Sequence, residues 1–302
     1  MREPPPGVAD DDVVAVVRRA WDPGVDAVTH LPVGFGAHHW AAYVGTDPRL
    51  FVTYDSGIRE ATELEAAYAG ALALREAGLE LVLAPVPTID GNVVVGFADG
   101  TLSCTPWRQG TSDPPLDVAW TTEALRRLRA TPPPAGLPLW RPKVGPDLAH
   151  DLGRLTRQAW GPGPYAAEAR DAVRRHLTDV EEWTTRYHHL AEVAADRAWV
   201  VCHGEPHHAN QLLTAEGRLL VDWDTLRLAP AELDLRVLVE HGVPPADAGA
   251  DRELLELFDL EWRLDEISQY AAWFAAPHAG TRDDDIAIGG LQHELGRPEP
   301  AW

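Results

Sequence analysis

Two short stretches of the chain bring together residue types that do chemistry. Residues 198–213 read AWVVCHGEPHHANQLL, in which histidines, Glu205 and Asn210 follow an apolar run. Residues 218–224 read RLLVDWD, in which a second apolar run ends in Asp222 and Asp224. Short apolar runs bounded by polar residues are typical of buried strands. We therefore expect Glu205, Asn210 and Asp222 to lie near one another at the ends of two strands.

Carboxylates and a carboxamide in such an arrangement suit phosphoryl transfer. That reaction needs a carboxylate to orient the attacking hydroxyl, together with oxygen ligands for the magnesium that bridges the nucleotide phosphates. A zinc site is the alternative, because His203, His207, His208 and Glu205 are also good zinc ligands. However, Glu does not follow His203 directly, and Pro206 prevents the continuous helix on which an HExxH motif places both histidines. Magnesium is therefore favoured over zinc.

The sequences HGEPHHAN, residues 203–210, and VDWD, residues 221–224, resemble the aminoglycoside phosphotransferase family, a branch of the protein-kinase-like fold. In that family the loop reads H-G-D-x-x-x-x-N and the next strand ends in I-D-x-[GDE]. The resemblance implies that Glu205 occupies the position of the catalytic carboxylate and that His203 stabilises the loop. It also implies Asn210 and Asp222 as ligands of Mg²⁺, and Asp234 as the structural acid that follows in the family.

The first hundred residues extend the resemblance. LPVGFGAHHWAAYV, residues 31–44, resembles the strand, turn and strand that cover the nucleotide phosphates, and TLSCTPWRQG, residues 101–110, resembles the hinge that receives adenine or guanine. Glycines in such a turn let backbone amides approach a phosphate. The GFG turn by itself is a common loop, and its position ahead of residues 203–224 gives it weight. The residues that the resemblance implies for nucleotide binding are Gly34, Phe35, Gly36, Ala37, His38, Cys104 and Thr105.

Two positions depart from the family pattern. Glu205 replaces the usual Asp, and the added methylene moves the carboxylate by ~1.5 Å, a displacement that can cost on the order of 100-fold in rate. In LFVTYDSG, Thr53 occupies the third-strand position at which the fold normally carries a lysine that contacts the α and β phosphates. Lys143 is the only lysine of the chain and lies beyond the hinge. The substitutes left open are Arg59, His38 or His39, and Mg²⁺ with backbone amides alone.

The order of elements predicts an α+β, two-lobed protein-kinase-like fold. Residues 1–106 form the expected N-terminal lobe, an antiparallel sheet with one main helix, and residues 107–302 form a larger, mostly helical C-terminal lobe. The strands are expected within residues 25–33, 39–44, 49–54, 79–87, 92–97 and 101–107, with the main helix at 61–78. Helical periodicity marks residues 121–131, 165–177, 179–198 and 251–276.

Composition limits the partners and the compartment. With 47 acidic and 26 basic residues the formal charge is −21, which repels a nucleic acid backbone and favours cationic small molecules or simply a solvated surface. The sequence holds no signal peptide and no long apolar segment, so we expect a cytoplasmic protein without a membrane span. Cys104 and Cys202 lie far apart in apolar segments and are expected to be reduced.

These features predict a kinase that transfers the γ-phosphate of ATP or GTP to a hydroxyl of an antibiotic-like small molecule, with Mg²⁺ as cofactor. The alternative is a kinase-like protein that binds nucleotide or ligand without turnover, because Thr53 and Glu205 both weaken catalysis. The acceptor groove is expected among the helices of the second lobe. Its helix at 251–276 carries acids that either face a cationic ligand or form a solvated side: Asp259, Glu261, Asp265 and Glu266.

Five further residues each have two interpretations. Asp224 either ligates the metal beside Asp222 or caps the next turn. Trp107 and Trp223 either contact a base or substrate or pack in the interior. Without a lysine partner on the third strand, Glu63 and Glu65 are expected to be solvated helix acids rather than members of an ion pair.

Overall fold

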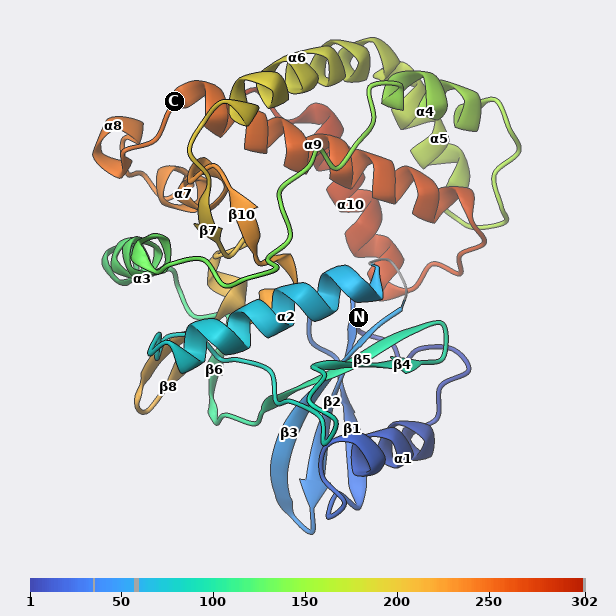
Figure 1. The fold of residues 1–302 in the computed structure, drawn as a ribbon. Coiled ribbons are helices and arrows are strands. Elements are labelled where there is room, and N and C mark those ends of the chain that lie inside the picture. Colours follow the sequence, from blue (N-terminus) through green and yellow to red (C-terminus); the bar gives the residue numbers. More distant parts are fainter. Residues whose placement is uncertain (35, 57–59, 301–302) are drawn as a thin grey trace. The chain divides into compact units, whose positions relative to one another are not determined.

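The computed structural model describes residues 1–34, 36–56 and 60–300. By its internal contacts the chain divides into two compact units, which are Met1–Leu139 with Trp199–Val237, and Trp140–Ala198 with Leu238–Trp302 (Figure 1). This division differs from the predicted lobes at 1–106 and 107–302, because residues 107–139 and 199–237 group with the N-terminal sheet. The assignment of nucleotide binding to residues 1–106 and of the catalytic and acceptor sites to residues 107–302 stays a prediction.

The first unit contains a five-stranded antiparallel sheet. Residues that oppose one another across neighbouring strands share a face of a sheet, so the register fixes two faces. One face carries Trp40, Val52, Tyr54 and Cys104, which form an apolar core beneath helix α1 (Asp10–Ala20). In order across the sheet, the strands are β1 (Ala27–Leu31), β2 (His38–Val44), β3 (Asp47–Asp55), β5 (Gly100–Pro106) and β4 (Val94–Phe97).

Helix α2 (Ala61–Glu76) organises a second core of the first unit. It ends just before Gly78, whose φ of 95° is a left-handed conformation that suits glycine, so the predicted stop is confirmed. Its buried residues include Leu64 and Leu74, which pack with Val201, Leu220, Trp223 and Leu226. The helix therefore supports the segments on either side of the two chemical motifs.

The predicted strand at residues 79–87 is wrong. Apart from an isolated bridge between Val82 and Leu220 and a single bond from Val86 N to the carbonyl oxygen of Cys104, the segment pairs with no strand among the described residues. Pro85 and Pro87 carry no N–H to donate to a sheet ladder. The apolar pattern arises instead because Leu79, Leu81 and Val82 are buried in the core beneath α2.

Two small sheets hold the chemical motifs. Strand β7 (Val200–Cys202) pairs with β10 (Arg227–Ala229), and β8 (Gln211–Thr214) forms a hairpin with β9 (Gly217–Leu220). The short strand β6 (Gly110–Ser112) extends that hairpin, and helix α3 (Val118–Ala130) contacts β7. The two predicted strands around the motifs thus belong to different sheets.

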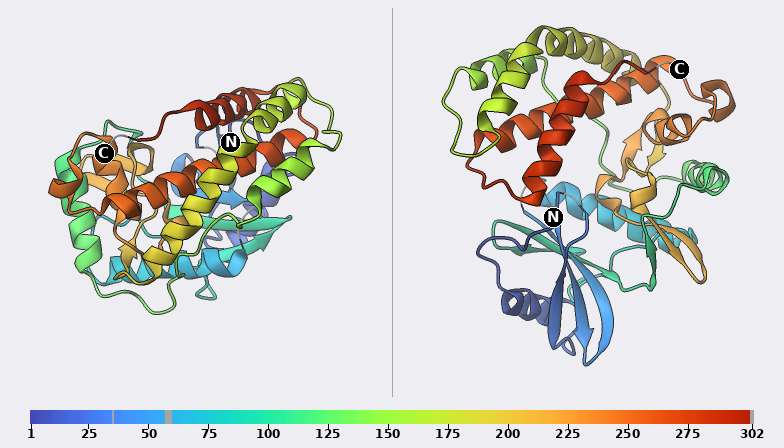
Figure 2. Two further views of the ribbon diagram at one scale, coloured as in Figure 1. Left: turned by 90° about the horizontal axis from the view of Figure 1, so that it is seen from above. Right: turned by 180° about the vertical axis from the view of Figure 1, so that it is seen from behind.

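The second unit consists of helices around the long α9 (Arg252–Ala275). Helix α9 packs against α4 (Leu148–Thr156), α5 (Ala166–Arg175), α6 (Leu177–Ala195) and α10 (Arg282–Gly296), as the views in Figure 2 show. Helices expected at 165–177, 179–198 and 251–276 are confirmed as α5, α6 and α9. The sequence did not predict α4, α10, the short α8 (Pro245–Ala248) or α7 (Glu232–Glu240), which begins in the first unit.

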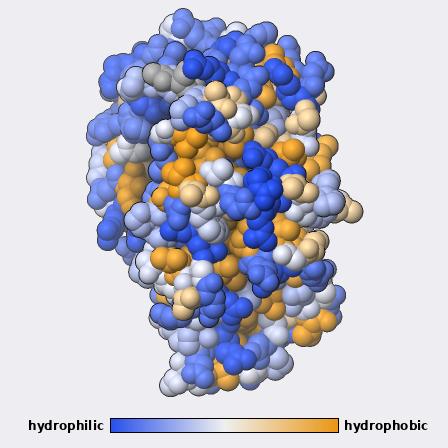
Figure 3. Space-filling view, turned by 90° about the vertical axis from the view of Figure 1, so that its left-hand side faces the viewer, coloured by the Kyte–Doolittle hydropathy of each residue, from blue (hydrophilic) through white to orange (hydrophobic). Residues whose placement is uncertain are grey.

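Hydrophilic residues cover most of the face drawn in Figure 3, with apolar areas between them. Such a mixture is ordinary for a chain with a formal charge of −21. Among the residues that the structure describes, each helix is too short or too polar to cross a membrane.

Candidate active site

The loop that follows β7 is fixed by the ring of His203. The side chain is fully buried, its Nδ1 accepts from the backbone N–H of Glu205 at 3.3 Å, and its Nε2 lies 2.9 Å from the carbonyl oxygen of Val221. With Nδ1 acting as an acceptor, the proton resides on Nε2 and is donated to Val221. Burial lowers the pKa of His203 to about 3, so the ring is neutral at physiological pH. His203 therefore connects the loop to the residue before Asp222.

A tight turn at Gly204 lies beside this ring. Gly204 has a φ of 99°, and a Cβ at this position would lie 2.7 Å from Cβ of Thr225. The hydroxyl of Thr225 donates to the carbonyl oxygen of His203 at 2.8 Å. Only glycine satisfies both the backbone conformation and the available space.

Asp234, in the first turn of α7, holds the same turn from the other side. Its carboxylate accepts from the backbone N–H groups of His203 and Gly204, both at 2.8 Å. Complete burial raises the pKa of Asp234 to about 6, although the two N–H donors oppose that shift. The family resemblance implied a structural acid at this position, and the two hydrogen bonds of Asp234 to the loop backbone are contacts that a structural acid makes.

The β8–β9 hairpin brings the Asn210 and Asp222 positions together. Gln211 pairs with Leu220, so Asn210 and Val221 lie opposite each other at the open end of the hairpin, where Val221 N donates to Asn210 O at 3.0 Å. The side chain Nδ2 of Asn210 donates to the carbonyl oxygen of Glu205 at 2.9 Å. This bond leaves Oδ1 as the atom of the carboxamide that can ligate a cation.

Asp222 adopts a backbone conformation that is uncommon for a residue with a side chain. Its φ is 64° and its ψ is 68°, in the left-handed region, and its side chain is exposed. Such strained residues cluster at functional sites. The next residue, Trp223, is buried and donates from Nε1 to the carbonyl oxygen of Leu220, so it packs in the interior. Asp222 occupies the N-cap position of the short 3-10 helix Trp223–Thr225, in which Asp224 lies, so both interpretations of Asp224 stay predictions.

Glu205 extends from the same loop with a partly exposed side chain. Its Oε2 lies 4.0 Å from Nε2 of His207, and burial lowers the pKa of that imidazole against the opposing effect of the Glu205 charge. His208 instead pairs with Asp113. Both ring nitrogens of His203 are hydrogen-bonded to the backbone, so His203, His207 and His208 each have a different partner. Within the described residues no three His, Cys, Asp or Glu side chains form a metal-binding group, so zinc gains no support.

The predicted nucleotide-binding residues are divided between the two faces of the sheet. Gly34 and Gly36 have positive φ values of 71° and 90°, and Ala37 completes the turn before β2. His38 lies on the α1 face, stacked on Tyr54, with Nδ1 3.0 Å from the carbonyl oxygen of Glu3. Phe35 lies outside the described residues.

The two hinge candidates also point to opposite faces. Cys104 is fully buried in the core beneath α1, and its carbonyl oxygen accepts from Val86 N at 2.7 Å. Thr105 pairs with Phe51 on the other, partly exposed face. Trp107 follows on the chain, its ring 6.5 Å from that of Phe51, and its indole nitrogen is buried without a hydrogen-bond partner in the described part of the chain. The sequence placed these three positions together, but the strand alternation separates Cys104 from the others.

Thr53, at the position of the missing lysine, pairs with His39 across the sheet, and its Oγ1 lies 3.2 Å from Nδ1 of that histidine. Arg59, another proposed substitute, lies outside the described residues. Glu63 is exposed, as expected, whereas Glu65 is partly buried and its carboxylate accepts from Val94 N at 2.9 Å. Glu65 thus anchors the start of β4, a role that the sequence did not reveal.

Each of the four acids of α9 has a partner in the second unit. Asp259 and Glu261 are buried, whereas Asp265 and Glu266 are partly exposed. Asp259 pairs with Arg297 at 2.9 Å, and Asp265 with Lys143 at 3.1 Å. The remaining contacts are those of Glu261, which accepts from Tyr187 and Trp140, and of Glu266, which accepts from Tyr270.

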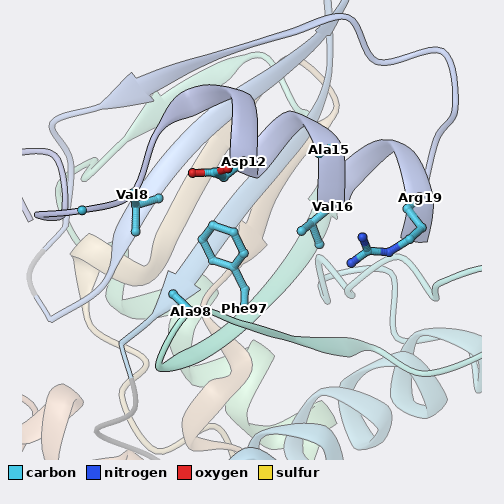
Figure 4. Close-up of a pocket in the computed structure, with 8 residues that line it drawn as sticks. Val8, Asp12, Ala15, Val16, Arg19, Phe97 and Ala98 are labelled. Atoms are coloured by element: carbon cyan, nitrogen blue, oxygen red, sulfur yellow. The ribbon is translucent and has the colours of Figure 1, made fainter.

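A shallow hollow of about 390 Å³ lies between α1 and the turn that joins β4 to β5 (Figure 4). Val8, Asp12, Val16 and Arg19 line it from the N-terminal segment and α1, opposite Phe97. It contains none of the predicted site residues.

Comparisons with known proteins agree with this architecture. Residues 31–273 match the profile of the phosphotransferase enzyme family. Protein StrN of Streptomyces griseus is 32% identical over 255 residues, which cover 78% of this chain and 77% of that protein. A spectinomycin phosphotransferase, solved with ADP and spectinomycin, has a TM-score of 0.71 at 14% identity, over 97% of this chain and 96% of that one. Amicoumacin kinase, solved with AMP-PNP, Ca²⁺ and Ami, has a TM-score of 0.58 at 11% identity, over 95% and 93%. The predicted α+β kinase-like fold is confirmed.

Proposed function

Because the chain belongs to the phosphotransferase enzyme family, we propose that it transfers the γ-phosphate of ATP or GTP to a hydroxyl of a small, antibiotic-like molecule. The observation that carries the proposal is the connected loop and hairpin. Asn210 donates to the carbonyl oxygen of Glu205 and accepts from the backbone of Val221, next to Asp222. Three oxygen-bearing side chains are thereby held on a single hydrogen-bonded framework, which is what phosphoryl transfer requires.

In this mechanism Glu205 accepts a hydrogen bond from the acceptor hydroxyl and orients its oxygen toward the γ-phosphorus. The new P–O bond forms as the bond to the β-phosphate oxygen breaks, so the nucleoside diphosphate leaves and the hydroxyl proton passes to Glu205. His203 keeps the carboxylate in place, because its ring accepts from the backbone N–H of Glu205. Positioning of this kind supplies most of the catalysis in phosphoryl transfer.

The residues present fit a magnesium ion. Asp222 offers an exposed carboxylate and Asn210 a carboxamide oxygen, and hard cations prefer such donors. When bound there, Mg²⁺ would neutralise the charge that develops on the phosphates.

For the acceptor we propose a hydroxylated antibiotic or a related compound. The support is the shared fold with kinases that were solved with spectinomycin and with Ami. The formal charge of −21 further favours a cationic acceptor through long-range attraction. We place the reaction in the cytosol, where nucleoside triphosphates are available and where buried thiols such as Cys104 and Cys202 stay reduced.

The test is a steady-state assay of nucleotide consumption with a panel of hydroxylated antibiotics, for the wild type and for Asp222→Asn. Loss of a metal ligand is expected to lower kcat/KM at least about 100-fold. Asp90→Asn, which neutralises an exposed turn residue, is the charge-matched control and should keep full activity. Turnover at the wild-type rate in Asp222→Asn would contradict the assignment of this site.

The second candidate is a protein that binds nucleotide without turnover, which the absence of a lysine at Thr53 and the presence of Glu205 favour. A thermal-shift titration with Mg-ATP and Mg-GTP distinguishes the two, because a ligand that binds only the folded state raises the melting temperature. A shift without phosphorylation of any acceptor would favour the binding protein. A shift with phosphorylation supports the kinase.

A further inference from the structure

The nucleotide phosphates of a kinase need a hydrogen-bond donor on the sheet, a task that a third-strand lysine usually performs. This chain has a threonine there, and its only lysine, Lys143, belongs to the other unit. We propose that His39, held by Thr53, donates a hydrogen bond from Nε2 to a phosphate oxygen of the nucleotide beside Gly34. The inference rests on the proposed function and assigns a residue to its phosphate site.

The strand register places His39 on the correct side of the sheet. His39, Thr53 and Ser103 oppose one another on β2, β3 and β5, on the face away from α1. That face is only partly covered, since His39, Phe51 and Thr53 all keep exposed surface. His38 is excluded from the role, because it faces α1 and its ring contacts Glu3 and Tyr54.

The backbone of Gly34 lies close to the ring of His39. A Cβ on Gly34 would lie 2.9 Å from Nε2 of His39, so any larger residue would collide with this nitrogen. The φ of 71° at Gly34 is likewise one that glycine adopts without strain. Gly34 therefore lets the backbone lie close to the Nε2 edge of the imidazole, and glycine-containing turns of this kind are where phosphate oxygens bind.

Thr53 selects the tautomer that the proposal requires. When its hydroxyl donates to Nδ1, at 3.2 Å, the ring proton resides on Nε2 and is available to the ligand. Burial, aided by the positive amino group of Met1 and by the neighbouring His38 and His30, lowers the pKa of His39 to about 3. Without a ligand the imidazole is therefore neutral, and its Nε2–H is the group that can donate to a phosphate oxygen.

Two amide variants of His39 test whether a donor at the Nε2 position is needed. His39→Asn places an amide near Nδ1 and has no donor at the Nε2 position, whereas His39→Gln places an amide nitrogen close to Nε2. Calorimetric titrations would measure the Kd of Mg-ADP and of adenosine for each folded variant. We expect His39→Asn to weaken Mg-ADP binding by about 10- to 100-fold, as for loss of a hydrogen bond to a charged group, with adenosine changed less than about 2-fold. His39→Gln should stay within about 3-fold of the wild type for both ligands.

Thr53→Val provides a second measurement if His39→Asn fails to fold. It keeps the imidazole but removes the group that sets the tautomer, so Mg-ADP should bind about 3- to 10-fold more weakly while adenosine binding is unchanged. Equal Mg-ADP affinity in His39→Asn, or in Thr53→Val where that variant is used, overturns the role of His39. Equal losses for Mg-ADP and adenosine overturn it as well, because they indicate general damage to the site. A wild-type protein that binds neither ligand instead contradicts the proposed function.

Discussion

Gly204 shows how strongly a single residue constrains the candidate site. Its positive φ turns the chain between His203 and Glu205, and Thr225 fills the space that a side chain would need. The turn also presents two backbone N–H groups to Asp234. A change at this position therefore affects the ring of His203 and the carboxylate of Glu205 together.

We predict that Gly204→Ala lowers the free energy of unfolding by about 3 kcal/mol or more, because a strained conformation and a steric clash add together. Gly91→Ala is the matched control, since Gly91 has a similar φ of 88° but no atom within 4 Å of the position that a Cβ would take. That control should cost only about 1 kcal/mol. Urea denaturation of both variants measures the difference, and equal costs would show that Thr225 does not crowd the turn.

Glu205 occupies the position at which the family pattern has an aspartate. Its N–H donates to His203 and its carbonyl oxygen accepts from Asn210, so both ends of the residue are fixed. The longer side chain therefore extends further from the loop than an aspartate would. An acceptor hydroxyl bound correspondingly farther out would accommodate this difference.

At the level of elements, α7 is connected to the loop after β7 through Asp234. Its carboxylate accepts two backbone N–H groups, whereas an asparagine offers one oxygen and turns its NH₂ toward the second donor. We predict that Asp234→Asn lowers the free energy of unfolding by about 1–3 kcal/mol and also reduces kcat. The measurements are urea denaturation and the assay of nucleotide consumption.

Glu76→Gln is the control for this experiment, because Glu76 is an exposed carboxylate at the end of another helix of the first unit, α2. It should change both quantities little. If Asp234→Asn unfolds at the same urea concentration as the wild type, the connection between α7 and the loop contributes nothing to stability.

For the whole molecule, the buried histidines determine how stability depends on pH. The pKa values of His39 and His203 are lowered to about 3, so the unfolded chain, with values near 6.5, binds more protons between these limits. Stability supplied by these two groups is therefore present above pH 6.5 and declines as the pH falls. Asp234 acts in the opposite direction, because its pKa is raised to about 6 and its folded form takes up a proton first.

His39 and His203 against Asp234 amount to roughly one proton equivalent, about 1.4 kcal/mol per pH unit, and the lowered pKa values of His30 and His207 act in the same direction as the two histidines. We therefore predict that stability decreases by at least about this amount per pH unit between pH 6.5 and pH 5. Urea midpoints measured across this range provide the test. His203→Asn should show a shallower pH dependence than the wild type, although it is less stable at pH 7. Stability that stays constant or rises on acidification would contradict the buried, neutral state of these rings.

The sequence by itself determined the residue types of the candidate site and the position of most of the elements. The types and spacing of Glu205, Asn210 and Asp222 are properties of the chain, and apolar alternation and helical periodicity are local, so the strands β1 to β3 and the helices α2 and α9 could be predicted. Helix α10 was missed because Gly289 and Gly290 lower helix propensity. Contact with Tyr270 explains the second glycine, since a Cβ there would lie 2.7 Å from its ring.

Only the tertiary structure decided how distant segments meet. It paired β8 with β9 and β7 with β10, it left residues 79–87 outside the sheet, and it gave the acids of α9 partners such as Arg297 and Lys143. It also assigned the adjacent histidines 38 and 39 to opposite faces, with Thr53 beside the second. The physical reason is that burial, register and hydrogen-bond partners depend on residues far away along the chain, which a local pattern does not specify.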